Sequence, residues 1–325
     1  MLPYGEFKMP QNNRHFRNIF ILLGVLASGC SSTNDKTTVA APPQPASVPV
    51  ALVAVPYQEA VRKAAQDLLA NAKLPADQKF NLVIDPLVDG NSGMRTVATD
   101  AMEKSVIEIV QSNFKQLDVK PFNNEVVSKL PLIMVGTFTP INLQGKADGE
   151  RDAYRICFAL ADLRTGKIIS KGLARSLPEG FDPTPLPFFR DMPVWSKDNA
   201  VDGYIKTCQG TKAGDPINSA YIDAVLAAST INEATEAYQQ KRYKDSLALF
   251  ESVLKNPAGN QARVYAGIYL DNQKLGHKPS AMKSFGHLVN MGLNADRLSI
   301  RFDFKPGATG FTTTQYPYNK WLSVI

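Results

Sequence analysis

The first half of the chain alternates between helical and strand patterns of apolar residues. From residue 60 to residue 72 they recur every three or four positions, which predicts an amphipathic helix. Residues 80–87 form a mostly apolar run and predict a buried strand that ends in a turn at 89–91. A second helix is predicted at 95–114, and further strands at 117–122, 130–138, 154–161 and 167–173. This order predicts an α+β fold with a mixed sheet.

From residue 215 the spacing of apolar residues becomes helical and stays so. Segments 243–250 and 278–285 align, so that Ser246 corresponds to Ala281 and Phe250 to Phe285. The small residue would let paired helices approach, and the Phe four positions later would fill the space between them. Two pairs of helices are therefore predicted at about 228–293, with a preceding helix at about 216–230 as a cap.

These two segments resemble tetratricopeptide repeats, whose period of about 34 residues is close to their spacing. The resemblance implies a helical array that binds other proteins. A plain pair of helical hairpins without a ligand groove is the alternative, because at least three repeats are usually needed for independent stability.

The N-terminal region has the pattern of an export signal. Arg14 and Arg17 precede an apolar run at 19–26, which is shorter than the roughly 20 residues that span a membrane. A basic segment, a short apolar segment and small residues before a cleavage point are typical of a secretory signal peptide. Here the small residues end at Gly29 and lead directly into Cys30.

Residues 26–30 (LASGC) resemble the lipobox of bacterial lipoproteins, with Ala27 where Leu or Val is more common. The resemblance implies cleavage after Gly29, lipid attachment to the sulfur of Cys30 and acylation of the new amino group. It also implies an anchor in the outer membrane, facing the periplasm, because Ser31 rather than Asp follows the cysteine. An ordinary signal peptide with a coincidental cysteine is the alternative. Residues 31–50, rich in Ser, Thr, Pro and Ala, are predicted to be a tether.

Further resemblances concern the middle and the end of the chain. The predicted elements at 80–87, 95–114 and 132–137, with the hairpin at 161–168, resemble the periplasmic domain of FlgO-type flagellar-assembly lipoproteins and their CsgG-like relatives. That family implies an assembly role and no catalytic residues. Residues 297–325 resemble the first strand and helix of OmpA-like domains, but none matches that family's wall-binding residues. Peptidoglycan is therefore expected as a ligand only if the chain is longer.

We divide the chain accordingly into five parts. They are a signal peptide (1–29), the lipidated cysteine with its tether (30–55), an α+β domain (56–213), tetratricopeptide-like helices (214–295) and a partial OmpA-like segment (296–325). The length of 325 residues and the 44% hydrophobic content allow two domains with real cores.

Charge and cysteine content narrow the functional classes. Removal of residues 1–29, with three basic residues and one acidic residue, lowers the net charge from +6 to +4. This mild charge, without a block of Lys and Arg, does not indicate nucleic-acid binding. With Cys30 lipidated, only Cys157 and Cys208 are left as thiols. In an oxidising periplasm they could pair, although Cys157 in a predicted strand is equally compatible with a small buried thiol.

A loop at 176–200 is rich in proline and aromatic residues. One hypothesis is a ridge that binds a partner, with Phe188, Phe189 and Trp195 as anchors. In the other, these aromatic side chains fold back onto the sheet and the prolines stiffen the cover.

No catalytic or cofactor motif is visible. His277 and His287 lie ten residues apart without a Cys or an acidic residue at ligand spacing, so we expect no metal site. Asp85, Asp89 and Asn91 are interpreted as a turn at the end of a strand. We therefore expect a non-enzymatic envelope scaffold that binds other envelope proteins, in a flagellar ring or a secretion machine. A regulator that activates a peptidoglycan synthase is the alternative.

Overall fold

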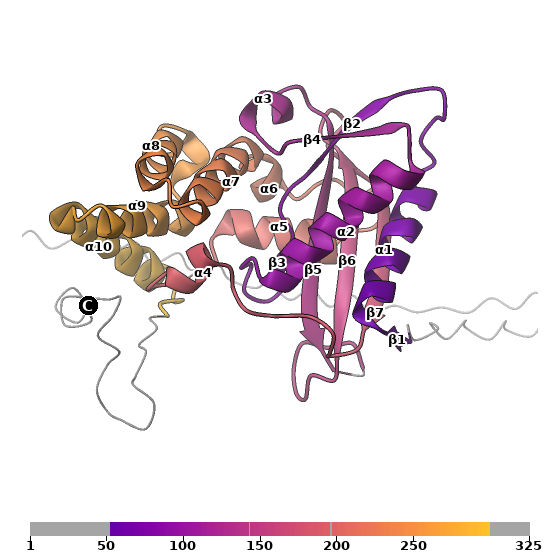
Figure 1. Ribbon diagram of the computed structural model, residues 1–325, viewed down its shortest axis with the longest axis horizontal. Coiled ribbons are helices and arrows are strands. Elements are labelled where there is room, and N and C mark those ends of the chain that lie inside the picture. The colour runs from indigo at the N-terminus through magenta and orange to yellow at the C-terminus, as the bar shows by residue number, and fades with distance from the viewer. Residues whose placement is uncertain (1–52, 143, 196, 300–325) are drawn as a thin grey trace, which may run out of the picture. The chain divides into compact units, whose positions relative to one another are not determined.

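The computed structural model describes residues 53–142, 144–195 and 197–299, which belong to one compact unit (Figure 1). In this part of the chain a mixed sheet of seven strands is followed by a run of packed helices, so the predicted α+β class is confirmed. The strands are β1 (Ala54–Val55), β2 (Phe80–Ile84), β3 (Val88–Asp89), β4 (Leu117–Lys120), β5 (Leu132–Ile141), β6 (Ala153–Asp162) and β7 (Lys167–Ser176).

The sheet has the order β1-β7-β6-β5-β2-β4, and β3 pairs with β5 beside β2. β2 runs parallel to both of its neighbours, β4 and β5, whereas β5, β6 and β7 form an antiparallel meander. β2 ends at Ile84 rather than at residue 87, because Asp85 precedes a proline that lacks the N–H needed to continue the ladder. The predicted buried strand is thus shorter than expected.

Helices α1 (Tyr57–Asn71) and α2 (Val97–Asn113) cover one face of the sheet, as Figure 1 shows. Thr96 and Thr99 form a reciprocal capping box that fixes the start of α2. On β7, a Cβ at Gly172 would overlap the carbonyl oxygen of Ala64, so the glycine is what lets α1 lie this close to the strand. Helix α2 lies within two residues of its predicted bounds, whereas α1 begins three residues before the predicted apolar pattern and ends one residue before its end.

Helix α5 (Asn199–Gln209) packs on the opposite face, together with the short helices α3 (Asn124–Val127) and α6 (Ser219–Ile222). The sequence analysis missed α5, which lies directly after the proline-rich loop. Its apolar residues nevertheless follow helical spacing, and they meet side chains of β5 and β6. The sheet is therefore covered on both faces.

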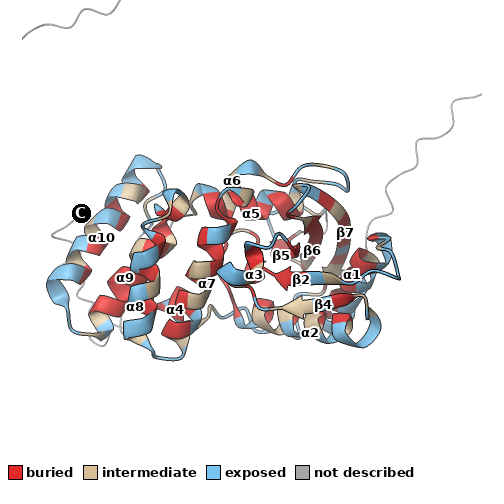
Figure 2. Cartoon of the chain, turned by 90° about the horizontal axis from the view of Figure 1, so that it is seen from above, coloured by how far each residue is buried: buried red, intermediate tan, exposed pale blue. Residues whose placement is uncertain are grey.

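The C-terminal helices form two hairpins, α7 (Val225–Gln239) with α8 (Tyr243–Val253) and α9 (Ala262–Lys274) with α10 (Lys278–Asn294). All four residues predicted to pack in the repeats are fully buried: Ser246, Phe250, Ala281 and Phe285. A Cβ at Gly267 would overlap the ring of Phe250, so this glycine gives the ring its place between α8 and α9. Figure 2 shows the buried sides of these helices facing one another.

The predicted capping helix at 216–230 is wrong. The structure instead has α6 and, after a break at Asp223–Ala224, the start of α7. Helix α7 serves both halves, since Val225 and Ala228 join the core beneath the sheet while Ala227 and Ile231 join the helical core. The boundary predicted at 213/214 thus does not separate two cores. Gly29, Cys30, residues 31–52 and residues 300–325 lie outside the described residues. The tether predicted over 30–55 is wrong at its end, because Ala54 and Val55 form β1 and pair with β7.

None of the helices in the described ranges is long and apolar enough to cross a membrane.

Candidate functional site: a basic hollow beside a disulfide

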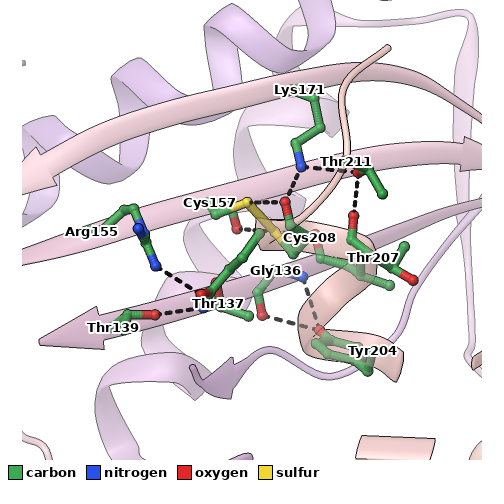
Figure 3. Close-up of a disulfide and its surroundings, with 12 residues drawn as sticks. Gly136, Thr137, Thr139, Arg155, Cys157, Lys171, Tyr204, Thr207, Cys208 and Thr211 are labelled. Atoms are coloured by element: carbon green, nitrogen blue, oxygen red, sulfur yellow. Dashed lines mark hydrogen bonds between the residues drawn. A yellow bond between two sulfur atoms is a disulfide. The ribbon is translucent and has the colours of Figure 1, made fainter. Parts of the chain in front are cut away.

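A disulfide joins Cys157 in β6 to Cys208 in the last turn of α5 (Figure 3). Their Cα atoms are 6.1 Å apart, inside the range that a disulfide requires. Both residues are buried between the sheet and the helix. Of the two alternatives that the sequence left open for these cysteines, the structure has the disulfide, and the bond fixes the end of α5 to the middle of the sheet.

Polar side chains from three strands hold the same end of α5, as the dashed lines in Figure 3 show. The Lys171 Nζ on β7 donates to the carbonyl oxygen of Cys208 and, at 3.3 Å, to Thr211 Oγ1. The Arg155 Nη2 on β6 donates to Gln209 Oε1 at 2.7 Å. The Gln209 amide in turn donates to Thr139 Oγ1 on β5 at 2.9 Å. These cations also lie at the negative end of the helix dipole, where positive charge is stabilising.

Tyr204, one turn earlier in α5, fastens the helix to the neighbouring strands. The backbone N–H of Gly136 donates to its hydroxyl at 2.9 Å, and the hydroxyl lies 3.1 Å from the carbonyl oxygens of Gly136 and Pro86. Burial raises the pKa of this hydroxyl well above its usual value, so it is a neutral donor and acceptor at any physiological pH.

Beyond the end of α5 the structure has a hollow of about 490 Å³. It is lined by Arg155, Lys171 and Lys212, by the two cysteines, and by no acidic residue. Burial lowers the pKa of Lys171 to about 8, and burial together with the nearby Arg175 lowers the pKa of Arg155. Among the described residues none of the three lining cations lies within salt-bridge distance of a carboxylate. The hollow is therefore suited to an anionic group.

A second polar site lies where the sheet meets the helices, in a cavity of about 40 Å³. Asp85, at the end of β2, is buried there and accepts a hydrogen bond from the Tyr221 hydroxyl at 2.7 Å. Burial raises the pKa of Asp85 to about 7, although the Tyr221 hydrogen bond and the charges of Arg263 and Arg95 oppose the rise. A carboxyl group in this position changes charge near neutral pH.

Arg95 links α2 to α7 across this cavity. Its Nη1 donates to Asn232 Oδ1 on α7 at 3.3 Å, and its Nη2 lies 3.2 Å from Asp100 and 3.6 Å from Glu103 on α2. The buried Nε atoms of Arg95 and Arg263 have no hydrogen-bond partner among the described residues. The cavity has room for water-sized molecules that could satisfy them, but it is far smaller than the roughly 300 Å³ of typical ligand pockets.

The aromatic residues of the proline-rich loop do not form the predicted partner-binding ridge. Phe188 and Phe189, in the short helix α4 (Pro187–Asp191), are buried against the C-terminal helices, and Phe188 stacks on Phe250. Trp195 is half-buried and donates from Nε1 to the carbonyl oxygen of Ser92 at 2.8 Å. These side chains thus fold back onto the protein, as the second hypothesis has it, but onto helices rather than onto the sheet. Phe181 alone contacts the sheet, among Tyr57, Phe138 and Tyr154.

The remaining candidates have structural roles. Asp89 Oδ1 accepts hydrogen bonds from the backbone N–H groups of Asn91 and Ser92, which confirms the predicted turn. His277 Nδ1 lies 3.2 Å from Asn272 Oδ1, and His287 stacks on Tyr265. In the described ranges no group of three or more His, Cys, Asp or Glu residues is arranged to hold a metal ion.

Sequence reasoning did not single out Arg155 and Lys171, which line the hollow, or the burial of Asp85 in the cavity. The two cations lie in strands at alternate positions that read as ordinary solvent-facing residues, and only the docking of α5 encloses them. Asp85 carried a weak signal, since an acidic residue directly after a buried strand commonly lies at a sheet edge where ligands bind.

Comparisons with protein-family models, with curated proteins and with solved structures find no match. The resemblances described above therefore stay predictions from the sequence.

Proposed function

We propose that this protein is a lipid-anchored periplasmic scaffold of an outer-membrane assembly, such as a flagellar ring or a secretion machine. It would act by binding other envelope proteins. The observation that carries this proposal is the export signal that runs directly into Cys30. Several acyl chains on this residue would make a stable anchor, whereas a single chain is marginal.

The Cys157–Cys208 disulfide supports an extracytoplasmic location, because such bonds persist in oxidising compartments and are rare in the cytosol. Binding rather than catalysis is supported by the two polar sites. The titratable groups of the Asp85 cavity enclose a space of only about 40 Å³, and the basic hollow offers charge without a nucleophile paired to a base.

The test is the intact mass of the protein extracted from membranes of its native host. We expect the loss of 29 residues and the addition of acyl mass on Cys30, and Cys30→Ser should abolish both. An unacylated wild-type protein would contradict the anchor. Affinity capture from envelope extracts then tests the scaffold role: ring or secretion components support it, whereas recovery of a peptidoglycan synthase alone would favour the regulatory alternative.

A further inference from the structure

Strand β7 is paired along its whole length on one side and only at its two ends on the other. Its inner side pairs with β6 from Lys167 to Ser176, interrupted only by a bulge at Ile169. On the outer side, β1 pairs with Arg175 and Ser176, while Ile168 exchanges backbone hydrogen bonds with Gly214 and Asp215. Between these two contacts the described residues offer no outer partner to residues 170–174.

The direction of the free backbone groups follows from the pairing at the C-terminal end. The N–H of Leu177 points outward, since it donates to the carbonyl oxygen of Val55 at 2.9 Å. Because backbone groups alternate along a strand with a period of two, those of Leu173 and Lys171 point to the same outer side. Leu173 is 42% exposed. A row of unpaired donors and acceptors of this kind is a template for another strand.

Among the described residues, β1 covers only the C-terminal end of this edge. It begins at Ala54, and the preceding Val53 is unpaired and 79% exposed.

The basic hollow opens along the same edge. It is lined by Asn71 from α1 on one face of β7 and by residues 211–213 from the loop after α5 on the other. It contains three positive charges, those of Arg155, Lys171 and Lys212. Asp215 does not line the hollow, but its negative charge favours the protonated form of Lys171. The buried Nε of Arg155 has no hydrogen-bond partner among the described residues.

Lysines and bulges on an edge strand also protect against aggregation, and β7 has both, with a register shift opposite Leu160 and Ala161. The cations beside the edge also determine which kind of strand can pair with it. An apolar or basic strand would leave buried cations uncompensated, whereas an acidic strand would neutralise them.

We propose that the free edge of β7 binds an extended acidic segment of a partner protein as an additional strand, with its carboxylates in the hollow formed by Arg155, Lys171 and Lys212. Main-chain hydrogen bonds to Lys171 and Leu173 would supply affinity, and the cations would supply specificity. This inference deepens the proposed function by naming the chemistry of the partner. It does not depend on acylation, so the two proposals can fail separately.

The test uses the purified full-length chain and a fluorescein-labelled octapeptide of alternating Val and Glu, with binding followed by fluorescence anisotropy at low salt. We expect the alternating Val and Lys peptide to bind at least tenfold more weakly. The Val and Glu peptide with N-methyl groups at alternate positions should also bind at least tenfold more weakly, because it cannot donate to the edge. Equal binding of either control overturns the proposal.

Protein variants locate the site. Lys212 is exposed, so Lys212→Glu should leave the fold intact and weaken binding at least fivefold. The control is Arg62→Glu on α1. Arg62 is also exposed and its replacement makes the same change of charge, but it should have no effect on binding. Equal losses in the two variants would mean non-specific attraction and would overturn the proposal.

Hydrogen exchange distinguishes backbone pairing at the edge from electrostatic attraction alone. Peptide binding should slow exchange of the Lys171 and Leu173 amides, since these would become paired. Unchanged exchange at saturating peptide, or complete displacement of the peptide by millimolar inorganic phosphate, would reduce the hollow to a simple anion site and overturn strand addition.

Discussion

Ser246 Oγ in α8 donates a hydrogen bond of 2.7 Å to Asp271 Oδ2 in α9, and both side chains are fully buried. The other carboxyl oxygen of Asp271 has no partner among the described residues. Ser246 lies one turn from Phe250 on α8, and Asp271 lies one turn from Gly267 on α9. The first helical hairpin therefore meets the second through a polar pair beside the packed ring of Phe250, within an apolar core.

Because of this burial the helical hairpins should be more stable in mild acid than in mild alkali. Burial raises the pKa of Asp271 to about 7, compared with about 3.9 in an unfolded chain. Between these values the folded protein keeps a proton that the unfolded chain releases, so the free energy of unfolding falls as the pH rises from about 4 to 7. Asp271→Asn should reduce the difference between pH 5 and pH 8 by on the order of 1–3 kcal/mol in urea unfolding.

The matched control is Asp245→Asn, since Asp245 lies on α8 with an exposed side chain. It should leave the pH dependence unchanged. A wild-type pH profile in the Asp271→Asn variant would contradict the assignment.

Tyr221→Phe should destabilise the junction between the sheet and the helices, and more so at high pH. The variant removes the only side-chain hydroxyl that donates to Asp85 in the described structure. Loss of that hydrogen bond raises the pKa of Asp85 further above 7 and leaves its ionised form buried with one donor fewer. We expect a loss of about 1–3 kcal/mol at pH 8 and a smaller loss at pH 5, where Asp85 is protonated.

Urea unfolding of Tyr221→Phe and of Tyr265→Phe at both pH values checks this prediction. The Tyr265 hydroxyl makes no hydrogen bond among the described residues, so its removal should have little effect. Equal losses at pH 5 and pH 8 in Tyr221→Phe would show that Asp85 does not titrate in this range.

The sequence predicts elements whose apolar residues have a regular spacing, but it does not predict how elements that are distant in the chain pack on one another. Helix α1 and the hairpin of β6 and β7 each show one apolar face, and each was predicted close to its observed bounds. Helix α5 has a polar stripe of Asn199, Asp202, Lys206 and Gln209, but it has only eleven residues, contains Gly203 in its interior and directly follows the proline-rich loop, so its period was missed. Without α5 in place, neither the approach of Cys208 to Cys157 nor the enclosure of Lys171 follows from the pattern.

Loss of the disulfide should lower stability without abolishing the fold. The bond closes a loop between residues 51 positions apart, and constraint of the unfolded chain by such a loop contributes about 2–4 kcal/mol. Lys171, Gln209 and Tyr204 still hold α5 to the sheet in its absence. Replacement of Cys157 and Cys208 by Ala should therefore lower the urea midpoint while the circular dichroism spectrum stays the same.

Reductant supplies the control for this variant. It should lower the midpoint of the wild-type protein and leave that of the double variant unchanged. An equal effect on both would show that the stability lost does not come from this bond.

Phe188 distinguishes a core role for the proline-rich loop from a binding role. Its ring is fully buried, stacks on Phe250 with centroids 5.5 Å apart and meets Tyr238 and Phe189 edge to face. Truncation of a buried Phe leaves a cavity and destabilises by about 3–5 kcal/mol. Phe188→Ala should show a loss of this size in urea unfolding, whereas Leu226→Ala, at a partly exposed position on α7, should lose less than about 1 kcal/mol. A stable Phe188→Ala protein that had lost its partners in envelope capture would instead restore the loop as a binding ridge.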